Sequence, residues 1–408
     1  MSASVLVTGA NSGLGYAICC RLIDEFLITR PPEAVLTLFL TTRDQRKCDS
    51  TVQRLRKRIG PSNATRISLQ PEILDLSSIR SVQALSRKLL RVNAHIDSLI
   101  LNAGIGGWIA VNWPLAIYGL ITGWAHAVTW PEFKISAVGG VTKPQVLLKD
   151  AAKDDPEPPL GDVFCANVFG HYLLCHYLAP LLAADETHPH PGRIIWLSSL
   201  EAYDQSLVMN DFQGIQNSQA YEASKRLTDV LVLTSELPAT KSYVRNYLPA
   251  GPEQARPKLY VSHPGICSTG IFPLPFILGL CMTAAFYIAR WLGSMWHTCK
   301  PYTAACAPVW LALAPQATLD ELETREGKGK WGSATDWFGN ERVARTEVEG
   351  WGYNGTVGIS AAAGKKGRWK HARDLTKEDR EEFEQRGIDC WKEMEALRAE
   401  WEARGGKL

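Results

Sequence analysis

The sequence has little that would hold the chain together through metal ions or disulfides. Its ten cysteines form no Cys-x-x-Cys pair, and no group of cysteines and histidines has the spacing of a zinc site. We therefore expect no metal centre and no disulfide framework. The cysteines are better explained as small buried side chains in a protein of a reducing compartment.

The sequence also lacks an excess of charge of either sign. Its 44 lysines and arginines nearly balance its 42 aspartates and glutamates, which leaves a net charge of +2. Such a chain has no overall field that attracts nucleic acid, so we expect no nucleic-acid partner. Nor do the first residues resemble a signal peptide, because a short apolar run follows Ser4 without a basic flank. We expect any membrane contact to come from an internal segment.

Charge is absent from two long stretches and concentrated in a third. No Asp, Glu, Lys or Arg occurs in 98–131 or 259–289, whereas 36 of the 89 residues from 320 to 408 are charged. This contrast predicts an apolar portion with a buried core, followed by a solvated extension that ends in a helix near 376–402.

Strand-like apolar runs alternate with helix-period stretches in the apolar portion. Near-continuous apolar strands indicate a sheet that is covered on both faces, and the alternation indicates parallel strands. Strands are expected at 4–9, 36–42, 67–76, 96–104, 193–200 and 258–265, and helices at 13–27, 45–59, 77–92, 162–184 and 219–237. The sequence therefore predicts an α/β fold, a doubly wound parallel sheet of the Rossmann type.

A glycine cluster follows the first expected strand, in the order Thr-Gly-Ala-Asn-Ser-Gly-Leu-Gly from residue 8. Glycines allow a tight turn and a close approach of the backbone to a pyrophosphate, which the N–H groups of the next helix then face. We expect this loop to bind a dinucleotide through Gly9, Ser12, Gly13, Leu14 and Gly15.

Tyr221 and Lys225 are four residues apart, so they share one face of the expected helix. A nearby ammonium stabilises a phenolate, and we expect Lys225 to lower the pKa of Tyr221 so that the tyrosine can give a proton to a carbonyl oxygen. Ser199, at a strand end, is expected to hold that oxygen. An insertion, 204–217, must loop out between Ser199 and Tyr221, and Ser198 is expected to be a structural hydroxyl.

The end of the second strand indicates the cofactor. A carboxylate there would accept the ribose hydroxyls of NAD, whereas a cation would accommodate the extra phosphate of NADP. Arg43 follows Thr42 at this point, with Arg46 and Lys47 close behind, which favours NADPH. A shift of one residue would place Asp44 there instead and reverse the preference.

In these motifs the chain resembles the short-chain dehydrogenase/reductase family over roughly residues 1–270. The resemblance implies that Asp75 lies near the adenine ring, that Asn167 is the active-site asparagine, and that Tyr221 and Lys225 also contact the cofactor. It further implies cofactor contacts for Asn102 and Gly104 of an Asn-Ala-Gly motif and for Gly265, Ser268 and Thr269 beside the nicotinamide.

Within that family, the segments 199–206, 211–231, 263–269 and 285–298 resemble the fungal 3-keto-sterol reductases of sterol C4-demethylation. The resemblance implies NADPH-dependent reduction of a sterol 3-ketone in ergosterol biosynthesis, at the endoplasmic reticulum or lipid droplet, with the catalytic domain cytosolic and other C4-demethylation enzymes nearby. Two alternatives remain: reduction of another triterpenoid, retinoid or xenobiotic ketone, and a largely structural scaffold for membrane sterol enzymes. The intact Ser199, Tyr221 and Lys225 argue against the scaffold.

The resemblance and the charge pattern together divide the chain into three parts. Residues 1–270 are expected to form the NADP-binding catalytic domain, with an apolar insertion at about 106–160, and 316–408 a charged C-terminal extension. Residues 271–315 are expected to contact substrate or membrane. Their uncharged core, 276–289, is too short to span a bilayer, so it should dip into one leaflet with Trp291 and Trp296 near the headgroups, or line the substrate pocket.

Overall fold

The computed structural model describes residues 2–145, 157–249, 251–271, 276–358, 367–369 and 372–405. Its centre is an eight-stranded sheet in the order β10-β9-β8-β7-β4-β1-β2-β3, in which every pairing is parallel except that of β9 with β10. The strands are β1 (Ala3–Val7), β2 (Leu36–Thr42), β3 (Ile67–Ile73), β4 (Ser98–Leu101), β7 (Arg193–Leu197), β8 (Lys258–His263), β9 (Lys330–Thr335) and β10 (Glu341–Thr346).

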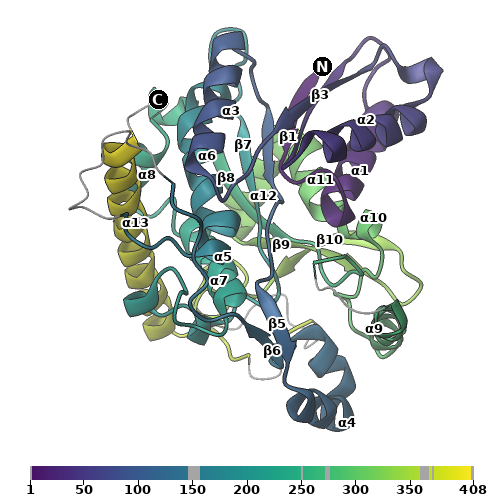
Figure 1. Ribbon diagram of the computed structural model, residues 1–408, viewed down its shortest axis with the longest axis vertical. Helices are drawn as coiled ribbons and strands as arrows, with labels where there is room; N and C mark the ends of the chain where they lie inside the picture. The colour runs from purple at the N-terminus through teal and green to yellow at the C-terminus, as the bar shows by residue number, and fades with distance from the viewer. Residues whose placement is uncertain are drawn as a thin grey trace.

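Helices cover both faces of this sheet (Figure 1), and a hydrophobic core fills the space on each side. One core contains residues of α3 (Ile79–Val92), α6 (Gly170–Leu178), α7 (Ala220–Leu233) and α13 (Lys377–Gly405). The other contains residues of α1 (Gly13–Thr29), α2 (Gln45–Ile59), α11 (Cys306–Leu313) and α12 (Gln316–Glu326). The prediction of a doubly wound α/β fold is confirmed. The remaining helices are α4 (Trp113–Thr129), α5 (Asp162–Phe164), α8 (Lys241–Tyr247), α9 (Phe276–Trp291) and α10 (Pro301–Ala304).

The charged C-terminal portion is more than a solvated extension. β9 is buried along its whole length and pairs in parallel with β8, so it completes the sheet. The predicted final helix, α13, is present, and it buries Trp391 and Trp401 in the core beside α7. The segment Lys-Trp-Gly-Ser-Ala-Thr of β9 has no apolar run that would have revealed it as a buried strand.

The first parts of the two uncharged stretches contain β4 and most of β8 of the central sheet, whereas their later parts, with α4 and most of α9, lie at one end of the molecule (Figure 1). The insertion folds into the hairpin β5 (Trp108–Val111) and β6 (Lys134–Ser136), with α4 between its strands. α4 packs against α9, and the indole Nε1 of Trp124 donates to the carbonyl of Ala285 at 3.4 Å. Among the described residues, no helix has both the length and the apolarity needed to cross a membrane.

Candidate active site

The glycine loop joins β1 to α1 at the carboxyl edge of the sheet. A Cβ on Gly15 would lie 2.1 Å from the carbonyl oxygen of Gly9, so only glycine lets the helix begin this close to the strand. Ser12 is the N-cap residue, yet its side chain makes no capping hydrogen bond to the first turn of the 17-residue helix. The N–H groups of that turn are therefore placed to bind an anion, as a pyrophosphate site requires. Gly13 and Leu14 lie in the same turn.

The Asn-Ala-Gly segment packs against this loop. Asn102 Nδ2 donates to the carbonyl of Thr8 at 2.9 Å, and the backbone N–H of Asn102 donates to Thr8 Oγ1 at 2.9 Å. Gly104 lies against Asn167, whose Oδ1 would be 2.8 Å from a Cβ at position 104. The sequence-predicted residues at the ends of β1 and β4 are thus brought together.

The structure shows which charged side chain follows the end of β2. The strand ends at Thr42, and Arg43 is the first residue after it, with an exposed side chain. Asp44 is the N-cap residue of α2, and its carboxylate accepts from the backbone N–H of Lys47 at 2.9 Å and pairs with the Lys47 ammonium at 3.1 Å. Because the carboxylate is engaged in capping, the group offered at the strand end is the guanidinium.

Other predicted cofactor residues lie around the same edge. Asp75 follows β3, and its carboxylate accepts from the backbone N–H of Ser77 at 3.0 Å. Thr269 lies beside the glycine loop, since its Cβ would be 3.5 Å from a Cβ on Gly13. Ser268 Oγ is 2.9 Å from Thr283 Oγ1 of α9. Gly265 has a φ of 68° and a backbone so close to Trp296 that a side chain would not fit. Their roles toward the cofactor stay predictions.

Ser199, Tyr221 and Lys225 meet where β7 ends and α7 begins. The Ser199 side chain lies beside that of Tyr221, and the Lys225 ammonium lies 5.5 Å from the centroid of the Tyr221 ring. Lys225 Nζ also donates to the carbonyl of Leu197 at 2.8 Å. Tyr221 and Lys225 are both buried. The predicted insertion loops out between Ser199 and Tyr221, and Arg386 of α13 holds it through Asp204 at 2.7 Å.

Asn167 sits in a π-helical turn, Cys165–Phe169, directly before α6. Its amide Nδ2 donates to the carbonyl of Ile105 and to Ser224 Oγ, both at 3.0 Å, and its Oδ1 accepts from the backbone N–H of Ile105 at 2.8 Å. The side chain is therefore engaged in fixing the segment after β4 against α7, so it positions the site.

Burial has the largest effect on the pKa values of Tyr221 and Lys225. It raises the pKa of Tyr221, and the negative charge of Glu201 raises it further. Burial lowers the pKa of Lys225 to about 8, and the positive charge of Lys330 lowers it as well. The pKa of Tyr221 is therefore raised, contrary to the expectation that Lys225 lowers it. A tyrosine with a raised pKa holds its proton at neutral pH, which is the form that a proton donor needs.

A charged cluster beside Tyr221 was not predicted from the sequence. Lys134 of β6 pairs with Glu201, and its ammonium lies 3.8 Å above the ring of Trp108, which is 4.7 Å from the ring of Tyr221. The pKa of the neighbouring Glu222 is raised to about 7 by burial and by the charge of Glu201. No motif links these residues, since the insertion that carries Lys134 reaches the site only through the fold.

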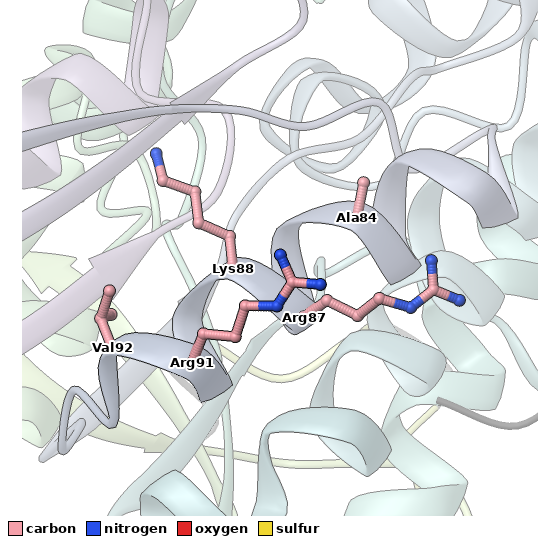
Figure 2. Close-up of a pocket in the computed structure, with 5 residues that line it drawn as sticks. All are labelled: Ala84, Arg87, Lys88, Arg91 and Val92. Carbon is pink, nitrogen blue, oxygen red and sulfur yellow. The ribbon is translucent and has the colours of Figure 1, made fainter.

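Two surface features contribute nothing to this site. A depression lined by Ala84, Arg87, Lys88, Arg91 and Val92 lies along α3 alone (Figure 2), and Lys88 points away from the two arginines. Elsewhere in the described part of the chain, the ligand atoms of His95, Asp185 and His188 lie within 4.8 Å of one another. The two imidazoles are stacked nearly parallel, at 7°, so their nitrogen lone pairs run side by side rather than toward one ion.

A glycine loop at the end of β1 and a Ser–Tyr–Lys group at the end of β7, on a doubly wound parallel sheet, define a short-chain dehydrogenase/reductase. A scan of protein-family models found no match. The chain is 46% identical to the 3-keto-steroid reductase erg27 of Aspergillus fumigatus, over 98% of this chain and 94% of that protein. It is 41% identical to the Gibberella zeae enzyme, over 98% and 94%, and 35% identical to that of Schizosaccharomyces pombe, over 84% and 90%. The chain belongs to the family of 3-keto-steroid reductases, as the sequence motifs predicted.

Solved structures give more distant likenesses. A 3-oxoacyl-[acyl-carrier protein] reductase from Brucella melitensis, in complex with NAD, has a TM-score of 0.46 and 16% identity over 76% of this chain and 90% of that one. A metagenomic short-chain oxidoreductase in complex with NADP has a TM-score of 0.40 and 18% identity over 77% and 92%. These likenesses are too weak to add to the family assignment.

Proposed function

We propose that this chain reduces the 3-keto group of a sterol intermediate of ergosterol biosynthesis to a 3-hydroxyl with NADPH. Family membership supports the substrate class, because the relatives are named 3-keto-steroid reductases. The observation that carries the proposal is the placement of Ser199 beside Tyr221, with Lys225 one turn further along α7, since two neighbouring hydroxyl groups can both donate to one carbonyl oxygen.

The residues present fit a dinucleotide with a 2′-phosphate. The uncapped first turn of α1 offers N–H groups to the pyrophosphate. Arg43 at the end of β2 offers a guanidinium to the 2′-phosphate of the ribose. Asp75, Asn102, Gly104, Ser268 and Thr269 are the further candidates around this edge. When bound, NADPH supplies the hydride.

The protein's part is to hold the ketone and deliver a proton. Ser199 donates to the carbonyl oxygen and fixes its place. Tyr221, kept protonated by its raised pKa, transfers its phenolic proton to that oxygen as negative charge develops on it. Lys225, fixed by the carbonyl of Leu197, then lies 5.5 Å from the ring and stabilises the phenolate that remains.

Tyr221→Phe tests this proposal because it removes only the hydroxyl group. We expect NADPH binding, followed by the fluorescence of the bound cofactor, to stay within about twofold of the wild type. Turnover of a detergent-dispersed 3-keto sterol should fall by about 10²–10⁴-fold, the range of general acid catalysis. A variant with nearly normal turnover would show that another group donates the proton.

We further propose that the protein docks on a membrane surface, at the endoplasmic reticulum or lipid droplet, through α4 and α9. Both helices expose large apolar side chains: Trp113, Ile117, Tyr118 and Ile121 on α4, and Ile277, Leu280, Ile288 and Trp291 on α9. The 16 residues of α9 span roughly 24 Å, less than a hydrocarbon layer of ~30 Å, so the surface would enter one leaflet. A sterol ketone could then reach the site from the bilayer, beside other C4-demethylation enzymes.

Two details of the predicted membrane contact are corrected by the structure. Trp296, expected near the headgroups, is buried, and its indole Nε1 donates to the carbonyl of Gly367 at 2.7 Å. Phe286 is buried too, although it lies in the same apolar run. The exposed face of α9 is therefore formed by other residues, with Ile277 and Leu280 among them.

A further inference from the structure

A second buried lysine lies behind the catalytic group. Lys330, the first residue of β9, has a side chain only 3% exposed, and that of its partner Asp229 is 1% exposed. Its ammonium donates to Asp229 Oδ2 at 2.6 Å, to the carbonyl of Ser199 at 2.6 Å and to Ser198 Oγ at 3.1 Å. All three protons of the ammonium thus have an acceptor.

These bonds tie the strand end that carries the active serine to the helix that carries the tyrosine. Ser198 Oγ donates in turn to the backbone carbonyl of Lys225 at 3.3 Å, and Asp229 lies one turn after Lys225 on α7. Lys225 itself holds the carbonyl of Leu197. The ammonium groups of Lys225 and Lys330 therefore donate to alternate backbone carbonyls at the end of β7, those of Leu197 and Ser199.

A buried ion pair is costly, and apolar side chains of similar volume often stabilise a fold as well or better. At this position the pair does something that an apolar pair could not do, because it bonds directly to the Ser199 carbonyl. We propose that Lys330 is a positioning residue for carbonyl reduction: with Asp229, it fixes Ser199 relative to Tyr221.

The charged groups around Lys330 make the pH dependence of the reaction a second test of its role. Lys225, Arg226 and Asp229 face it from α7, and His263 faces it from β8. The positive charge of Lys330 lowers the pKa of Lys225, whereas Asp229 raises it. Loss of the Lys330 charge should therefore raise the pKa of Lys225. The fall of kcat at alkaline pH, which follows deprotonation of Lys225, should then move to higher pH.

The experiment compares Lys330→Met, the double variant Lys330→Met/Asp229→Asn and the control Lys328→Met. Lys328 is also a buried lysine, with a side chain 9% exposed, but it pairs with Glu236, away from the active serine. The single variant leaves Asp229 as an uncompensated buried charge and can fail to fold. The double variant removes both charges, so we expect it to recover thermal stability.

The proposal rests on carbonyl reduction by this site, so each variant is assayed with NADPH on a 3-keto sterol and on a small cyclic ketone. We expect kcat of the double variant to fall by about 100-fold, as for other misplaced catalytic groups, while the KM for NADPH stays within about twofold and Lys328→Met keeps wild-type kcat. The alkaline limb of folded Lys330→Met should move to higher pH. A stable double variant with wild-type kcat would overturn the proposal. Wild-type activity on the small ketone but not on the sterol would overturn the substrate class alone.

Discussion

The side chains of Ser199 and Tyr221, 22 positions apart in the sequence, lie side by side where β7 ends and α7 begins. The intervening insertion does not separate them, because it leaves the sheet edge as a loop and is held by Arg226 and Arg386 through Asp204. The reductase site therefore forms as in a chain with a shorter connection, and the insertion is free to contact the C-terminal helix.

Arg43 should determine the choice between NADPH and NADH. Arg43→Asp should lower kcat/KM for NADPH by more than tenfold, while NADH use changes little, because a carboxylate repels the 2′-phosphate. Lys57→Asp makes the same change of charge on the exposed last turn of α2 and serves as the control. If the ratio of kcat/KM for NADPH to that for NADH is unchanged in the Arg43 variant, this side chain does not bind the 2′-phosphate.

The Lys134–Glu201 pair should couple the insertion to Tyr221. Lys134→Met leaves Glu201 without its cation in a site where both side chains are at least 85% covered, which should cost about 3 kcal/mol of unfolding free energy. Turnover should fall as well, since the hairpin beside Tyr221 loses its anchor. Lys143→Met, an exposed position in the same insertion, should change neither quantity. Denaturant unfolding and steady-state kinetics measure both, and unchanged stability in Lys134→Met would contradict the coupling.

Buried histidines should make the protein sensitive to mild acid. Burial lowers the pKa of His297 to about 4 and of His171 to about 3, below the value of about 6.5 in an unfolded chain. The stabilisation is therefore complete above pH 6.5 and is lost as the pH falls toward these folded-state values. Each histidine should remove about 2 kcal/mol of unfolding free energy between pH 7 and pH 5. His297→Gln should reduce that loss, whereas exposed His190→Gln should not; equal pH slopes in both variants would refute the explanation.

Membrane docking should depend on the exposed face of α9. Ile277→Asp/Leu280→Asp places charges on side chains that are 72% and 62% exposed, so folding should be spared while sedimentation with phosphatidylcholine–phosphatidylinositol vesicles falls by about tenfold or more. Ile28 on α1 is even more exposed, at 83%, and Ile28→Asp should sediment like the wild type. Full vesicle binding by the double variant would show that the docking surface does not include this face of α9, and α4 would be tested next.

The sequence was sufficient for the residues that sit in local motifs. The glycine loop, Ser199, Tyr221 and Lys225 could be placed because strand ends and a four-residue helical spacing determine where they meet. Lys330 and Lys134 could not be found, since each reaches the site from a distant segment with no motif of its own. β9 was missed for a related reason: its buried Lys330, Ser333 and Thr335 find their partners only in the folded sheet.

The reduction of a sterol 3-ketone is tested most directly by following the hydride. The purified protein is incubated with a 3-keto sterol and NADPH that carries deuterium at the transferring position, and the product is examined by mass spectrometry. We predict a 3-hydroxysterol with a single deuterium at C3, formed by the wild type and lost in Tyr221→Phe. A wild-type protein that leaves the sterol ketone unchanged, while it reduces other ketones with the same cofactor, would contradict the assignment.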